Sequence, residues 1–308
     1  NKMELMATTG KKTILAALLA NLGITIAKFL GFAITKSSTM LAEGIHSSAD
    51  SANQLLLLLG TRRAKREPSS KHPFGYGRER YFWSFVVALI LFSLGSLFAI
   101  YEGVEKIRHP HAFDNASWAI GILIFGIFIE SFSFRTAIVE AKTIKGQTTW
   151  PKFVIRSKQP EIPVVLLEDA GALFGMVIAL AAISLVKITE DPIWDGIGTL
   201  SIGILLGVIA TILAREMHSL IIGESASETD RLKIVSVIEN NEQVVELVEM
   251  RTQHIGPEEI LIGVRVAFHE TLQTKEIAQL INQLEDDIRI ELKNAGPIFI
   301  EPELSGGN

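Results

Sequence analysis

Six long apolar runs, all within the first 214 residues, constrain the fold of this 308-residue chain more than any other feature. They fall at about residues 12–35, 38–62, 80–107, 116–142, 162–186 and 192–214. A membrane-spanning helix needs about 20 mostly apolar residues. The runs therefore predict six transmembrane helices, and we interpret the first as a span rather than a cleaved signal peptide.

The charge of the chain changes where these runs end. Residues 1–214 carry 21 Lys and Arg against 16 Asp and Glu, whereas residues 215–308 carry 8 against 18. The hydrophobic periodicity of the acidic part predicts a helix at 230–240, strands at 244–254 and 260–268, a helix at 274–294 and a strand at 298–300. We therefore expect a transmembrane domain over residues 1–214 and a ferredoxin-like α+β domain over residues 215–308.

Loop charges indicate the orientation. With the N-terminus in the cytoplasm, the inside loops hold twelve Lys and Arg and the outside loops hold four. The positive-inside rule then places both termini in the cytoplasm, and we expect a multi-pass protein of the cell membrane. The acidic C-terminal domain disfavours nucleic-acid binding. No P-loop, dinucleotide-binding or Ser/His/Asp pattern indicates an enzyme.

The second apolar run carries a polar stripe: Glu43, His46, Asp50 and Asn53. On a helix His46 and Asp50 share a face, because they are four residues apart. Burying a charged residue in lipid costs roughly 2.5–3.5 kcal/mol on insertion scales. A structural His–Asp pair would be the simpler interpretation in a soluble helix, but ionisable groups inside a membrane are usually functional. The pair therefore predicts half of a divalent-metal site.

Two adjacent acids in the fifth run, Glu168 and Asp169, are the natural other half of this site. Neighbouring residues differ by about 100° around a helix, so one of the two points straight at the second span. Alternatively the fifth span starts later and both acids lie at the membrane surface. Among the other charges in the runs, we expect Lys28 and Glu130 to snorkel, or to pair with each other or with Arg135. Glu130 alternatively lies along an ion or proton route.

The chain resembles the cation diffusion facilitator family over nearly its whole length. The resemblance rests on Ser38–Asp50 (STMLAEGIHSSAD) and His72–Arg80 (HPFGYGRER), with support from Asp191-Pro192-Ile193 and from the Arg251-Thr252 strand. It implies a homodimeric transporter, not an enzyme, that exports a divalent transition-metal ion in exchange for protons. Zinc is the first candidate for the ion, and no cofactor is implied.

The resemblance also implies the transport site. His46 and Asp50 match the family's two ligands from the second span, and Asp169 matches the acidic ligand from the fifth. Val165 stands where the family's fifth-span histidine would fall. We favour Glu168 as the fourth ligand, which is typical of a subgroup with a Glu-Asp pair, to which mitochondrial zinc exporters of animals are similar.

Several alternatives remain open at this point. Glu43, Asn53 or water are the other candidates for the fourth ligand. The chain has no cysteine, and a site of one histidine and carboxylates also accepts manganese, iron(II) or cobalt. A membrane-embedded metal hydrolase and a metal-binding scaffold without flux are rival functions.

Two further metal sites of the family are not expected here. Lys71 precedes His72 in the loop after the second span, where an acid would be needed. Val248, Arg265 and Glu301 stand at the positions of the family's cytoplasmic metal cluster, so dimerisation is expected to rest on packing.

Overall fold

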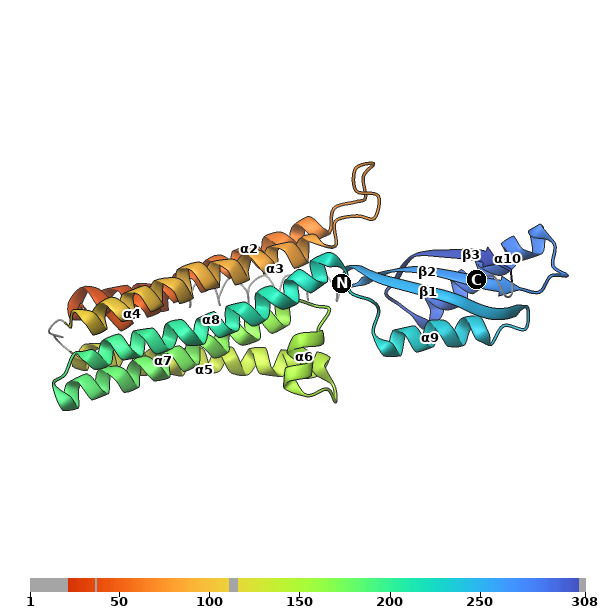
Figure 1. The fold of residues 1–308 in the computed structure, drawn as a ribbon. Helices are drawn as coiled ribbons and strands as arrows, with labels where there is room; N and C mark the ends of the chain where they lie inside the picture. The colour runs from red at the N-terminus through yellow and green to blue at the C-terminus, as the bar shows by residue number, and fades with distance from the viewer. Residues whose placement is uncertain (1–21, 37, 111–115, 305–308) are drawn as a thin grey trace, which may run out of the picture. The chain divides into compact units, whose positions relative to one another are not determined.

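The structure, a computed structural model, describes residues 22–36, 38–110 and 116–304 (Figure 1). A few side chains within these ranges lie outside the description, those of His46 and Asp50 among them. The predicted first span before residue 22 lies outside it as well. The chain divides into two compact units, residues 1–60 with 83–217 and residues 61–82 with 218–308.

Long helices make up the N-terminal two thirds of the described chain. The helix Leu22–Thr35 is followed by α2 (Ser38–Ala64) and by one continuous helix over Glu79–Arg108. That helix consists of α3 (Glu79–Ile90), the π-helical segment η1 (Leu91–Leu97) and α4 (Phe98–Arg108). Next come α5 (Ala116–Lys145), the short α6 (Trp150–Arg156), α7 (Glu161–Thr189) and α8 (Ile193–Ile222), which runs past the predicted end at residue 214.

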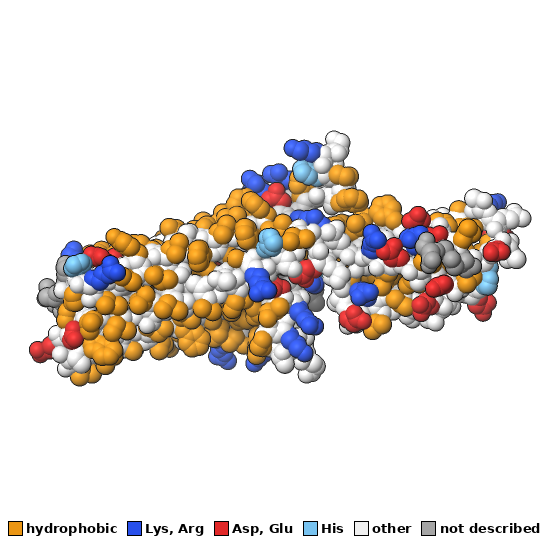
Figure 2. All heavy atoms as spheres, viewed as in Figure 1, with side chains coloured by type: hydrophobic (Ala, Val, Ile, Leu, Met, Phe, Trp, Pro, Cys, Tyr) orange, Lys and Arg blue, Asp and Glu red, His pale blue; other side chains and the backbone are white. Residues whose placement is uncertain are grey.

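Among the described residues, four helices are long and apolar enough to cross a membrane: Glu79–Arg108, Ser117–Val139, Glu161–Thr189 and Ile193–Ile222. The helix Leu22–Thr35 is apolar but shorter. The 27 residues of α2 span about 40 Å, which is sufficient to cross, but its polar stripe lowers its hydropathy. Hydrophobic side chains cover the visible face of these helices in Figure 2. The chain is therefore a helical membrane protein, and six spans stay a prediction.

Small residues let the helix Glu79–Arg108 lie close to α8. A Cβ atom on Gly103 would lie 2.5 Å from the backbone nitrogen of Leu200, and one on Gly203 would lie 2.7 Å from that of Ile100. The Ser96 hydroxyl, in η1, donates a 2.8 Å hydrogen bond to the Gly203 carbonyl. Backbone contact of this kind is how helices associate in lipid, where no hydrophobic force drives them together.

The C-terminal residues form a small mixed sheet with two helices. In chain order these elements are α9 (Glu228–Glu239), β1 (Val244–Gly256), β2 (Glu259–Phe268), α10 (Thr274–Glu291) and β3 (Ala295–Glu303). The strand order is β1-β2-β3, antiparallel between β1 and β2 and parallel between β2 and β3. Alternate residues of β2, such as Ile262 and Val264, share one core with Ile234 of α9 and Leu284 of α10. The predicted order of helices and strands is confirmed, whereas the ferredoxin-like assignment stays a prediction.

The close approach of α8 leads to a test of stability. Gly203→Ala should lower the unfolding temperature of the detergent-purified protein, because the new methyl group meets the backbone of the neighbouring helix at Ile100. Overpacking of this kind costs about 1–3 kcal/mol. Gly121→Ala is the matched control, since a Cβ atom there meets nothing within 4 Å. Equal unfolding temperatures for the two variants would contradict the close contact.

Candidate metal site

The inward face of α2 carries the positions of both predicted ligands. Glu43, Asn53 and Leu57 are buried and follow helical spacing. His46 lies three residues after Glu43, and Asp50 lies three before Asn53, so their positions fall on the same stripe. The side chains of His46 and Asp50 themselves are outside the description. The helix α2 thus carries both positions on its buried stripe, and their role as ligands stays a prediction.

Glu168 of α7 makes direct contact with this stripe. The Asn53 side-chain nitrogen donates a 2.8 Å hydrogen bond to Glu168 Oε1, across 115 positions in the sequence. Glu168 and Asp169 are only 4% and 7% exposed. Because α7 already begins at Glu161, both acids lie within the helix rather than ahead of it. The polar stripe of α2 and Glu168 of α7 therefore meet inside the bundle.

Asp169 points to a different neighbour. Its Oδ2 atom accepts a 3.1 Å hydrogen bond from the Ser133 hydroxyl of α5. The turn of about 100° between adjacent helical residues accounts for this difference from Glu168. Two neighbouring acids thus face two different helices, which the sequence alone did not resolve.

A second contact joins α2 and α7. A Cβ atom on Gly175 would lie 2.8 Å from Glu43 Oε1, so the absence of a side chain there makes room for the carboxylate. This contact and the Asn53–Glu168 hydrogen bond mark the two ends of a facing segment, which is residues 43–53 on α2 and residues 168–175 on α7. The predicted ligand positions between the two contacts are His46, Asp50 and Asp169. Val165 lies outside the segment 168–175 and is partly buried against the apolar core.

Lys28 forms a buried ion pair that the sequence analysis did not predict. Its ammonium group lies 3.0 Å from Glu43 Oε2 and 2.6 Å from the Ser47 hydroxyl, and Lys28 and Glu43 are 2% and 0% exposed. The sequence analysis expected Lys28 to snorkel or to pair with Glu130, whereas its ion-pair partner in the structure is Glu43. Arg135 is exposed, and Glu130 is half-buried.

These contacts narrow the choice of a fourth ligand. Glu43 is engaged by Lys28, and the amide of Asn53 is engaged by Glu168. Asn53 is therefore better suited to orient Glu168 than to replace it, as groups that hydrogen-bond to metal ligands do. Among the described side chains, which exclude His46 and Asp50, no three His, Asp or Glu form a metal-binding group.

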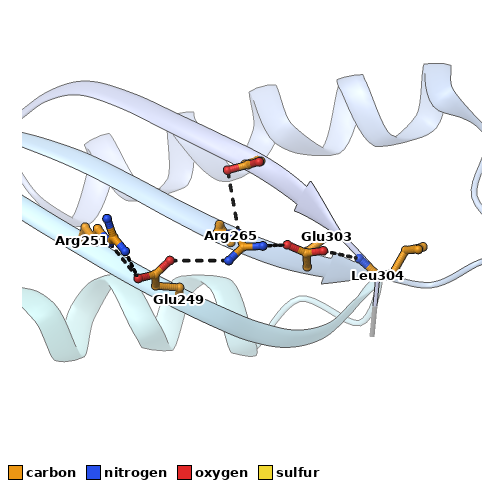
Figure 3. Close-up of polar contacts among 6 residues, drawn as sticks. Glu249, Arg251, Arg265, Glu303 and Leu304 are labelled. Atoms are coloured by element: carbon orange, nitrogen blue, oxygen red, sulfur yellow. Dashed lines mark hydrogen bonds and ion pairs between the residues drawn. The ribbon is translucent and has the colours of Figure 1, made fainter. Parts of the chain in front are cut away.

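The sheet carries a row of ion pairs that includes Arg265 and Glu301, two of the positions that the sequence resemblance assigned to a cytoplasmic metal cluster (Figure 3). Arg265 lies 3.7 Å from Glu249 and 3.9 Å from Glu301, and also pairs with Glu303. Arg251 pairs with Glu249 at 2.7 Å. A guanidinium group here balances the carboxylates that would otherwise attract a divalent cation.

The chain matches the sequence model of one protein family. Residues 14–222 match the model of the cation efflux transmembrane domain, which covers more than half of the chain. The chain therefore belongs to the cation efflux family, also called the cation diffusion facilitators, whose members are transporters of divalent metal ions and not enzymes.

Individual relatives agree with this assignment. The mouse mitochondrial proton-coupled zinc antiporter SLC30A9 is 28% identical over 284 residues, which cover 89% of this chain and 50% of that protein. Metal tolerance protein C4 of Arabidopsis thaliana is 31% identical over 258 residues, which cover 83% and 56%. The chain thus spans about half the length of these relatives. The expected similarity to mitochondrial zinc exporters of animals is confirmed.

The ion pair of Lys28 gives a second stability prediction. Lys28→Met should destabilise the protein by about 3–5 kcal/mol, because the Glu43 carboxylate stays buried without its cation. Adding Glu43→Gln, which removes the leftover charge at constant shape, should restore most of the loss. Thermal unfolding in detergent measures both variants. Wild-type stability of the single variant would contradict the buried pair.

Proposed function

We propose that this protein exports a divalent transition-metal ion from the cytoplasm in exchange for protons, by alternating access. The ligands in this proposal are His46 and Asp50 of α2 with Asp169 and Glu168 of α7. The observation that carries it is the Asn53–Glu168 hydrogen bond, which brings the stripe of α2 next to Glu168 of α7. A half-site on one helix becomes a complete site only if a second helix supplies such groups.

Zinc is the proposed ion. One histidine and several carboxylates suit zinc, and the mouse relative is named as a zinc antiporter. With Val165 in place of a second histidine, the site holds more oxygen ligands, which favour manganese or iron(II) more than a two-histidine site would. Efflux of manganese or iron(II) by the same mechanism is therefore the alternative.

Competition between metal and protons explains the coupling. A metal ion and a proton bind the same lone pairs, so ligands must be deprotonated to hold the metal. When the ion leaves on the outer side, buried carboxylates such as Glu168 and Asp169 would remain charged at low dielectric. Proton uptake removes that charge, and the ordinary pKa of an imidazole, about 6.5, lets His46 take part near neutral pH.

The organisation of the whole protein follows from the same proposal. We expect six spans, including the helix Leu22–Thr35 and α2, in a transmembrane domain over residues 1–214. A ferredoxin-like dimerisation domain over residues 215–308 would follow it. The loop charges support cytoplasmic termini, and we propose the cell membrane as the location.

Metal-driven proton movement tests the transport site. The protein is reconstituted into vesicles with a pH-sensitive dye inside, and zinc, manganese, iron(II) and cobalt are added in turn. His46→Ala and Asp169→Ala should each reduce the initial rate to that of empty vesicles. Asn53→Ala, which releases Glu168, should weaken apparent metal affinity roughly 10–100-fold.

Glu190→Gln is the matched control for these variants. Glu190 is an exposed acid at the end of the same helix, α7, so its substitution should leave the flux unchanged. Normal flux in His46→Ala or Asp169→Ala would refute the ligand assignment.

We propose a homodimer, as the family resemblance implies, and we expect that it does not depend on metal. This expectation is supported by Arg265, a position that the resemblance assigned to a metal cluster, because its guanidinium group pairs with Glu301 and Glu303. Light scattering coupled to gel filtration should therefore give the mass of two 33.8 kDa chains both with and without EDTA. Dissociation into single chains on addition of EDTA would contradict this prediction.

A further inference from the structure

A cavity of about 650 Å³ opens beside the loop between α2 and α3. The loop contributes residues 71–76 to its walls, and Ile221, Gln253 and Ile255 contribute from the other side. All lining residues belong to the second compact unit. The loop contains the His72–Arg80 motif, and none of the proposed metal ligands lies in this motif.

The cavity has an excess of positive charge. Arg63, Lys71 and Arg78 line it, against the single acid Glu79, which lies 3.9 Å from Arg63. The Nε atom of Arg78 is buried and has no hydrogen-bond partner among the described residues. Three cations against one acid leave this cavity with a net positive charge, which suits an anionic ligand.

The loop is held in shape by its own contacts. Ser69 and His72 exchange backbone hydrogen bonds of 3.1 and 3.0 Å, and Gly75, at a φ of 78°, donates one of 3.0 Å to the His72 carbonyl. The Tyr76 and Ser69 hydroxyls lie 3.0 Å apart, and the rings of His72 and Tyr76 are 4.8 Å apart. The cations are therefore presented by an ordered loop, which lowers the entropy lost on binding.

The loop lies next to the membrane in sequence. It follows the five leucines 55–59 of α2 and precedes the apolar part of α3, and residues 62–80 carry seven Lys and Arg against two Glu. Phe74 and Phe82, which also line the cavity, are 45% and 49% exposed. Basic clusters at the end of a membrane span attract anionic lipids, and the apolar rings would contact the rest of such a molecule.

We propose that this cavity binds the phosphate group of an anionic phospholipid, with Arg78 and Lys71 as its charged contacts. Arginine suits the task because its planar fork of donors matches two phosphate oxygens at once. The positive-inside rule explains the number of cations in the loop, but it does not account for a cavity that three of the cations line. The proposal goes beyond metal transport and does not require the assignment of the metal ligands.

Lipid titration without metal tests the site. The full chain in a neutral detergent is titrated with short-chain phosphatidylglycerol, short-chain phosphatidylcholine and inorganic phosphate, and binding is followed by thermophoresis. Arg78→Gln and Lys71→Gln should each weaken phosphatidylglycerol binding roughly fivefold. Lys71 is exposed, so its substitution is not expected to affect folding.

Lys65→Gln and Arg66→Gln are matched controls. They remove the same charges from the same basic stretch but do not line the cavity. Weaker phosphatidylglycerol binding in the two cavity variants alone supports the lipid site. If those variants instead lose binding of inorganic phosphate to the same extent, the ligand is free phosphate and the lipid assignment is wrong. Equal weakening in all four variants, or no binding of either probe, would overturn the proposal.

Discussion

The arrangement of the helices depends on polar side chains that cannot be left alone in lipid. Each such group needs a partner on another helix, because the surrounding hydrocarbon offers none. Lys28 joins Glu43, and Asn53 joins Glu168. These two contacts connect α2 to the helix Leu22–Thr35 and to α7. A protein built for stability alone would use apolar packing here, since buried ion pairs are seldom more stable than hydrophobic ones.

We therefore infer that the buried polar side chains serve transport rather than stability. Among the described residues, the helices bury the acids Glu43, Glu168, Asp169 and Asp195 but only one lysine, Lys28, which pairs with Glu43. A divalent ion would offset this negative charge in one state, and protons would offset it in the other. Membership of the cation efflux family fits this balance, because its members move divalent metal ions.

Small residues decide how the polar groups meet. Gly175 gives the Glu43 carboxylate its space, and Gly203 lets α8 lie against the helix Glu79–Arg108. Close backbone contact fixes the helices with little freedom to slide. In the proposed alternating-access mechanism, whole helices would therefore shift together, as expected for rocking of one bundle against another.

The sequence by itself determined the helical membrane class, the order of elements in the C-terminal sheet, the family, and the two helices that carry the candidate ligands. Long apolar runs, strand alternation and local motifs depend on residues close in the chain, so they can be recognised without coordinates. Only the tertiary structure decided that Lys28 pairs with Glu43, that Glu168 faces α2, and that Asp169 faces Ser133. Those partners are 15, 115 and 36 positions apart, and their meeting depends on how each helix is rotated and how closely it packs.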